Sequence, residues 1–192
     1  MVRSFTDRTV APDVLDGILD LARRAPSAGH TQGIDLVVLQ GRAETEQFWD
    51  RSLPGGEPVT GTMPFPQLPR ADVVVVVTTS PEAYVARYRE SDKATAGWGA
   101  GSDVWPVPYW WVDAGAVMQN LLLAVTAAGL GACFFSAAHI EAELVEDLDV
   151  PAGHRVVGAV AIGHSSRDDE PSGSAIRRPR RPLGEVVHRG GW

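Results

Sequence analysis

Asp72-Val-Val-Val-Val-Val-Thr78 places five consecutive valines in a chain of 192 residues. β-Branched side chains favour strands, and an apolar run without polar alternation is typical of a strand that is buried on both faces. The stretch therefore predicts a strand in the interior of the fold.

Further helices and strands are expected on both sides of this stretch. Residues 111–128 are apolar nearly all round, which indicates a helix at the centre of the fold or between subunits. Neither an internal repeat nor a linker is evident, so residues 1–192 are interpreted as one α+β domain. Apolar periodicity predicts helices over 12–24, 44–51, 81–89, 111–128 and 141–148, and strands over 34–39, 72–78, 132–136 and 155–162.

Two segments within about 52–110 are expected to form a loop-rich cap or substrate region. Residues 52–70 are rich in Pro and Gly, and residues 91–110 are irregular and rich in Trp and Tyr. The polar tail from Ser165 onward ends in an extended arm that bears Leu183, Val186 and Val187.

Composition excludes several classes of protein. Hydrophobic residues make up 44% and charged residues 21%, as in ordinary folded proteins. The net charge of −7 disfavours nucleic acid and anionic lipid as partners. Neither a signal peptide nor an apolar run of about 18 residues is evident, so we expect a cytoplasmic protein with no membrane partner.

Metal and hydrolase sites have little support. The five histidines never occur at i, i+4 spacing, and the single cysteine, Cys133, lies in an apolar run that predicts a buried, inert thiol. No G-x-S-x-G elbow is present. Gly97-Trp-Gly-Ala-Gly101 neither follows an expected strand nor opens a helix, so it is interpreted as a loop rather than a dinucleotide site.

Three separated patches remain. They are Arg3-Ser4-Phe5-Thr6-Asp7, Ala25-Pro-Ser-Ala-Gly-His-Thr-Gln32 and Arg178-Pro-Arg-Arg-Pro-Leu183. Together with Asp113-Ala-Gly-Ala-Val-Met-Gln-Asn120 and Gly129-Leu-Gly131, they resemble, in the right order, the nitroreductase family of FMN enzymes. The resemblance implies a three-layer sandwich with a central mixed or antiparallel sheet, helices on both sides, and a C-terminal arm exchanged in a homodimer.

The resemblance also implies the residues that hold FMN. Arginine offers a planar fork of donors for phosphate oxygens, so Arg3, Arg178 and Arg180 are expected at the phosphate, with Ser4 beside them. The loop of the partner subunit is expected to meet the flavin's polar edge through Pro26, Ser27, His30 and Gln32. The backbone at Ser136 and Ala137 is expected near flavin N5. Each of these features also has a simpler interpretation when it is taken alone. The arginines also fit a solvated surface, the loop also fits a plain turn, and residues 136–137 also fit a simple strand end.

Two departures from the family affect these expectations. His30 stands where the family usually has asparagine. Many family members also carry an Arg-x-Ser upstream of Arg3 that has no counterpart in the printed sequence. Because those phosphate ligands are not found here, weaker FMN binding is expected unless other residues compensate. Trp98 and Trp105 suit either a substrate wall or packing, whereas Trp110 and Trp111 are expected to pack.

The implied activity is FMN-dependent transfer of hydride from NADH or NADPH to a small acceptor, such as a nitroaromatic or a quinone. The flavin performs the redox step, so no catalytic side chain is expected. The alternatives are a flavin-sequestering or flavin-sensing protein with little reductase activity, and a specialised member such as a biosynthetic flavin oxidase or a deazaflavin reductase.

Overall fold

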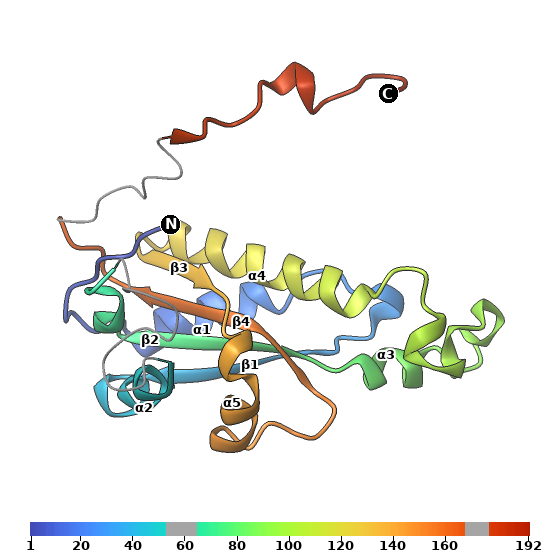
Figure 1. Ribbon diagram of the computed structural model, residues 1–192, viewed down its shortest axis with the longest axis horizontal. Helices are drawn as coiled ribbons and strands as arrows, with labels where there is room; N and C mark the ends of the chain where they lie inside the picture. The colour runs from blue at the N-terminus through green and yellow to red at the C-terminus, as the bar shows by residue number, and fades with distance from the viewer. Residues whose placement is uncertain (53–64, 168–176) are drawn as a thin grey trace.

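The computed structural model describes residues 1–52, 65–167 and 177–192. Helices and strands up to Gly163 form one body, and the C-terminal residues extend away from it (Figure 1). Most of the Pro- and Gly-rich segment expected over 52–70 lies outside the described residues.

Four strands form one antiparallel sheet in the order β1-β2-β4-β3. All seven residues of β2 are buried between its neighbours β1 and β4. The interior strand predicted from the five valines is therefore confirmed. The strands are β1 (Ile34–Gln40), β2 (Val73–Thr79), β3 (Gly131–Phe135) and β4 (Arg155–Gly163).

The valines of β2 divide between two cores because side chains alternate across a strand. Val73, Val75 and Val77 belong to a core that includes residues of α1 and α4. Val74 and Val76 belong to a second core that includes residues of α2 and α5. An unbroken apolar run is therefore needed at this position, because both faces of the strand are covered.

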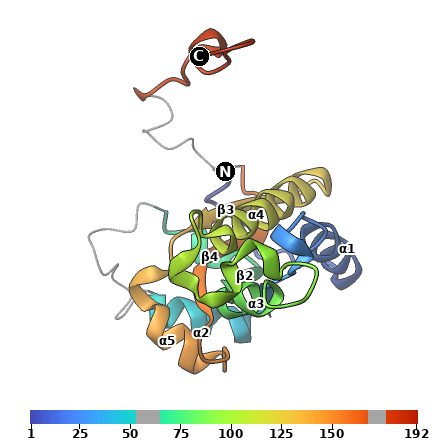
Figure 2. The same cartoon turned by 90° about the vertical axis from the view of Figure 1, so that its right-hand side faces the viewer.

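Helices cover both faces of the sheet, as the end-on view in Figure 2 shows. On one face lie α1 (Pro12–Ala22) and α4 (Tyr109–Ala127), and on the other lie α2 (Arg42–Ser52) and α5 (Glu141–Asp147). The predicted three-layer α+β fold with helices on both sides is confirmed. Within the described ranges, no helix is both long enough and apolar enough to cross a membrane.

Some helix boundaries differ from the sequence-based expectation. α1 ends at Ala22 rather than Arg24, and Arg23 and Arg24 form the closing turn, where both ion-pair with Asp20. α4 begins at Tyr109, two residues early, because Trp110 packs into an aromatic cluster from the first turn of the helix.

A short helix and three 3₁₀ turns connect β2 to α4. They are α3 (Pro81–Arg87), η4 (Ala94–Ala96), η5 (Trp98–Ala100) and η6 (Ser102–Val104). In Figure 1 this connection projects beyond the end of the sheet, next to the start of α4. It carries most of the tryptophan-rich segment.

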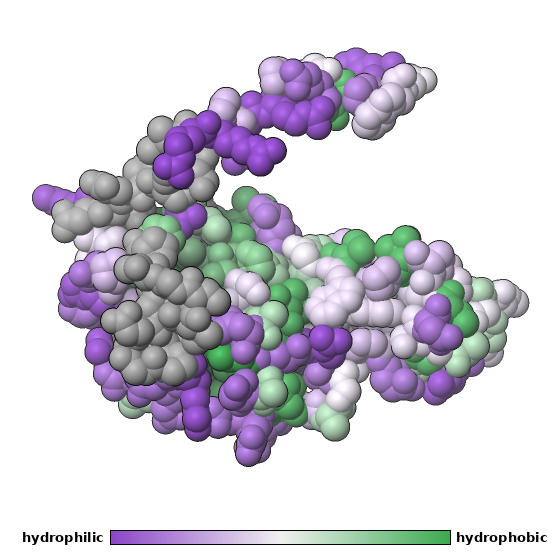
Figure 3. Space-filling view, in the orientation of Figure 1, coloured by the Kyte–Doolittle hydropathy of each residue, from purple (hydrophilic) through white to green (hydrophobic). Residues whose placement is uncertain are grey.

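The C-terminal arm, residues 177–192, stands clear of the body in Figures 1 and 3. It contains one 3₁₀ turn, η8 (Leu183–Glu185), and all its residues are exposed, including Leu183, Val186 and Val187. The body also exposes apolar side chains of α4, among them Val112 and Leu123. The single chain therefore leaves apolar surface uncovered on both the arm and α4.

Candidate functional site

The loop between α1 and β1 has an unusual backbone. Gly29, His30 and Gln32 have φ values of 63°, 56° and 55°. Glycine adopts this left-handed region freely, whereas His30 and Gln32 do so at a cost of about 1–3 kcal/mol each. Such a conformation persists only where the surroundings enforce it, and it is often found where a ligand binds.

Local hydrogen bonds give the loop its shape. The amide of Gln32 donates to Ser27 Oγ at 3.0 Å, and the amide of His30 donates to the Ser27 carbonyl at 2.9 Å. The Thr31 hydroxyl donates to the Ala28 carbonyl at 2.6 Å. Ser27 keeps its own hydroxyl proton for another partner, and the side chains of His30 and Gln32 are exposed.

Two further elements hold the loop from behind. The carboxylate of Asp113, on α4, accepts hydrogen bonds from the Ala28 amide and the Tyr84 hydroxyl, both at 2.8 Å. Arg87, on α3, donates to the Gly29 carbonyl at 2.8 Å. These three residues are the main part of the site that sequence reasoning missed.

Tyr84, on α3, and Tyr88, directly after α3, pack on the loop backbone. A Cβ atom at Gly33 would lie 2.7 Å from Tyr84 Cε2, and one at Gly29 would lie 2.8 Å from Tyr88 Cε2. Only glycine allows rings to approach the backbone this closely. The close contact explains why the loop has glycine at both positions.

Hydrogen bonds and burial shift the pKa of Tyr84 on α3 and of Asp92, a partner of Arg87. Burial and the hydrogen bond to Asp113 raise the pKa of Tyr84 well above its ordinary value, so its hydroxyl stays a donor. The hydrogen bonds from Arg87 lower the pKa of Asp92 to about 2. Arg87 thus joins the loop to an exposed carboxylate as well as to α3.

Arg3 and Ser4 lie far from this loop within one chain. The N-terminal segment runs beside β3, where the Val2 amide donates to the Ala132 carbonyl. The Arg3 guanidinium lies 4.8 Å from the centroid of the Phe65 ring, and Ser4 is buried. In Figure 1 the N-terminus lies near one end of α4, and the loop that follows α1 lies near the other.

Ser136 and Ala137 follow the end of β3 directly. Ser136 is exposed and Ala137 is buried. Among the described residues, neither backbone amide donates a hydrogen bond, whereas the Ala138 amide donates to Ser136 Oγ at 3.3 Å. Buried amides are normally paired, so this strand end has donors to offer a ligand.

The arm carries Arg178 and Arg180 away from the body. Both side chains are exposed. Arg181 differs, because its guanidinium donates to the carbonyl and the carboxylate of Glu185, at 2.5 and 3.4 Å. One chain therefore does not bring Arg178 and Arg180 to the loop or to Arg3.

The tryptophan-rich segment forms an aromatic cluster around Tyr84 and Tyr88. Trp98 stacks on Tyr88 with ring centroids 5.3 Å apart and remains partly exposed. Trp105 is only 6% exposed, and its indole N–H donates to the Trp98 carbonyl at 2.9 Å. The structure thus places Trp105 in packing, and Trp98 keeps a face that can meet a substrate.

Trp110 and Trp111 differ in their surroundings. Trp110 is buried in the aromatic cluster, as expected. Trp111, which is also expected to pack, is 37% exposed in the single chain. The guanidinium of Arg155, which is ion-paired with Glu141, lies 5.8 Å from the Trp111 ring centroid.

A small pocket lies directly beside the loop. Its volume is about 160 Å³, well below the roughly 300–1,000 Å³ of ordinary ligand sites. The pocket in one chain is therefore too small to be a complete ligand-binding site, and its residues can form only part of the lining of one. Its lining includes Pro26, Ser27, Gln32 and Asp113.

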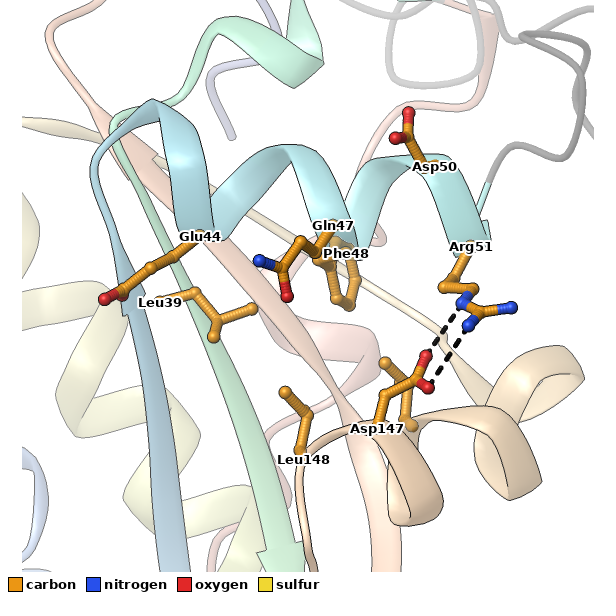
Figure 4. A pocket seen from close by; sticks show the side chains of 9 residues that line it. Leu39, Glu44, Gln47, Phe48, Asp50, Arg51, Asp147 and Leu148 are labelled. Atoms are coloured by element: carbon orange, nitrogen blue, oxygen red, sulfur yellow. Dashed lines mark hydrogen bonds and ion pairs between the residues drawn. The ribbon is translucent and has the colours of Figure 1, made fainter.

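A separate hollow of about 450 Å³ lies between α2 and α5 (Figure 4). Arg51 and Asp147 form an ion pair at its edge, at 2.8 Å, and Glu44 accepts a hydrogen bond from the Gln40 amide. No residue expected to bind FMN lines it. Among the described side chains, no group of three or more His, Cys, Asp or Glu could hold a metal ion.

Comparison with known proteins agrees with this arrangement. A solved nitroreductase family protein from Streptococcus pneumoniae TIGR4 superimposes with a TM-score of 0.72 at 22% identity, over 98% of this chain and 94% of that one. The NfrA2 protein of B. megaterium superimposes with a TM-score of 0.70 at 19% identity, over 100% and 70%.

Curated sequences show the same relationship. The FMN reductase [NAD(P)H] of Bacillus subtilis is 25% identical in an alignment 193 positions long, which covers 97% of this chain and 68% of that protein. A putative NADH dehydrogenase/NAD(P)H nitroreductase of Archaeoglobus fulgidus is 24% identical over 85% of this chain and 79% of that protein. The profile of the nitroreductase family matches residues 1–164, and the chain belongs to this family.

Proposed function

We propose that this protein is an FMN-dependent oxidoreductase that takes hydride from NADH or NADPH and reduces a small acceptor such as a nitroaromatic or a quinone. When bound, FMN supplies the hydride-transfer chemistry, and the protein supplies binding, orientation and electrostatics. The observation that carries the proposal is the loop 27–32. Its backbone is held in the left-handed region at Gly29, His30 and Gln32, and it presents polar groups outward.

The donor set fits FMN in kind. Arg3, Arg178 and Arg180 supply cationic forks for the phosphate, with Ser4 beside Arg3. Ser27, His30 and Gln32 present hydroxyl, imidazole and amide groups beside Pro26, which suit the polar edge of a flavin ring. The amides of Ser136 and Ala137, which donate no hydrogen bond within the described part of the chain, suit flavin N5, where a backbone donor would stabilise negative charge on the ring.

The proposal requires two copies of the chain. The N-terminus and the loop lie near opposite ends of α4, and the arm stands away from both (Figure 1). A second copy with its arm exchanged would cover the exposed apolar residues of α4 and bring its own loop to the first copy's Arg3. The name of the Bacillus subtilis relative, FMN reductase [NAD(P)H], agrees with the proposed cofactor and reductant.

The discriminating experiment is anaerobic reduction of the purified protein. We expect a flavin absorption spectrum that NADH or NADPH bleaches and that a quinone or nitroaromatic restores. A flavin that stays oxidised with both nucleotides would contradict the reductase proposal and favour a sequestering role. Light scattering of the FMN-loaded protein should give twice the 20.5 kDa chain mass. A monomer with FMN fully bound would contradict the shared site.

A further inference from the structure

Asp113 is the most unusual charged group next to the candidate site. Its side chain is 6% exposed, and a carboxylate is rarely buried to this degree without a cationic partner. No Lys, Arg or His ion pair with Asp113 occurs among the described residues. The burial is instead compensated by two donors, the Ala28 amide and the Tyr84 hydroxyl.

Both donors bond to the same carboxylate oxygen, Oδ2, each at 2.8 Å. One donor belongs to the loop between α1 and β1, and the other belongs to α3. The oxygen therefore joins three elements, α4, the loop and α3, at a single point. Hydrogen bonds to a charged acceptor are roughly twice as strong as neutral ones, so this point is a firm attachment.

The loop needs such an attachment. His30 and Gln32 follow Ala28 closely and keep left-handed backbone angles that a free loop would abandon. The amide of Ala28 stands at the start of this strained stretch. Arg87 supports it from the same side, through the Gly29 carbonyl.

We propose that Asp113 and Tyr84 are a positioning pair that holds the loop 27–32 in its ligand-binding conformation and thereby sets the affinity for the isoalloxazine ring. The inference rests on the proposed function. Losing this pair should have another effect than losing the phosphate clamp, by which we mean Arg3, Arg178 and Arg180, the arginines expected at the FMN phosphate. Loss of the pair should weaken riboflavin and FMN equally, because the loop is expected to meet the ring and not the phosphate.

The chain offers a matched control four residues further on, directly after the end of α3. Tyr84→Phe removes the hydroxyl and keeps the ring against Gly33. Tyr88→Phe removes a hydroxyl that makes no hydrogen bond among the described residues and keeps its ring against Gly29. The two variants thus differ in the contact with Asp113 and share their effect on packing.

A second pair of variants tests the carboxylate itself. Asp113→Asn keeps an oxygen that can accept both hydrogen bonds, whereas Asp113→Leu keeps a similar shape and removes the acceptor. We expect Asp113→Asn to retain binding within about threefold and Asp113→Leu to lose at least as much as Tyr84→Phe. Should Asp113→Leu fail to fold, the tyrosine pair still decides the question.

The experiment measures dissociation constants of riboflavin and FMN, and amide hydrogen exchange over residues 26–33 of the flavin-free protein. Tyr84→Phe should weaken both flavins about tenfold, equivalent to about 1.4 kcal/mol, and accelerate exchange in the loop. Tyr88→Phe should change neither quantity. Equal losses in the two tyrosine variants, or a loss confined to FMN, would overturn the positioning role.

Failure of the inference is distinguishable from failure of the proposed function. A parent protein that binds neither flavin would overturn the proposed function, and the exchange measurement would still report whether Tyr84 and Asp113 hold the loop. A parent that binds flavin and is reduced by NADH or NADPH, alongside a Tyr84→Phe variant of unchanged affinity and unchanged exchange, would overturn the positioning pair alone.

Discussion

The sharpest prediction concerns the phosphate clamp, because the arm contains its own control. Arg178, Arg180 and Arg181 are exposed, lie within four residues and carry the same charge. Arg181 already donates to the carbonyl and the carboxylate of Glu185, so its guanidinium is engaged within the arm. Within residues 1–52, 65–167 and 177–192, Arg178 and Arg180 make no such bonds, and we expect their donors to bind the phosphate.

The expected magnitude follows from the bonds at stake. Loss of one charge-assisted hydrogen bond costs about 1.5–3 kcal/mol. At about 1.4 kcal/mol per tenfold, Arg178→Ala or Arg180→Ala should weaken FMN binding roughly 10- to 150-fold. Arg3→Ala should fall in the same range, although it also removes the contact with the Phe65 ring. Arg181→Ala should change FMN binding by much less.

The assay is fluorescence titration of flavin-free protein with FMN and with riboflavin, and circular dichroism confirms folding of each variant. Because riboflavin lacks the phosphate, its affinity should be far weaker for the parent and unchanged by Arg178→Ala and Arg180→Ala. FMN binding at parental strength in all three predicted clamp variants would refute the assignment. So would a loss in Arg181→Ala as large as that in Arg180→Ala.

Three further predictions follow from the same structure. Turnover should give parallel initial-rate lines, because both substrates must meet one flavin face, and intersecting lines would count against a shared site. Trp98→Ala should shift the preference among acceptors with little change in flavin content, whereas Trp105→Ala should destabilise the fold by about 3–5 kcal/mol in urea unfolding, because Trp105 is buried. Arg87 lowers the pKa of Asp92 from 3.8 to about 2, so the stability from this pair is present above about pH 4 and is lost as the pH falls towards 2. Urea unfolding should show that the parent loses stability faster than Asp92→Asn over this interval, and equal slopes would exclude a contribution from the pair.

The helices and strands could be predicted from the chain because their signals are local, whereas the three-layer arrangement was expected from the resemblance to the nitroreductase family. Five valines in succession predict a strand that is covered on both faces. The structure places these valines alternately in two hydrophobic cores. Helix ends were less predictable. The start of α4 depends on how Trp110 packs against α3, which is a tertiary contact with no local signal.

The candidate site was predictable in its exposed residues and not in its supporting ones. Ser27, His30 and Gln32 stand in a short polar loop, and the functional hypothesis for them came from the resemblance to the nitroreductase family, since the residue types alone also fit a plain turn. Asp113 opens a stretch of α4 that resembles the nitroreductase family, but nothing in that stretch indicates a contact with the loop, and Tyr84 stands in an ordinary amphipathic segment. Their partnership spans 29 residues of sequence and becomes visible only when the helices are placed.

The exposed residues of the site were easier to predict than the supporting ones for a physical reason. A ligand contact requires particular donors on a particular loop, and such residues leave a recognisable order along the chain. Holding the strained loop in place requires only a buried hydrogen-bond acceptor for one of its amides. Many pairs of residues on α3 and α4 could provide such an acceptor. In this chain the acceptor is the carboxylate of Asp113, which forms no ion pair with a cationic side chain among the described residues. The cost of burying it is therefore offset by the hydrogen bonds from Tyr84 and from the Ala28 amide. The loop and its support therefore stabilise each other. The loop amide offsets the cost of burying Asp113, and Asp113 offsets the backbone strain at His30 and Gln32.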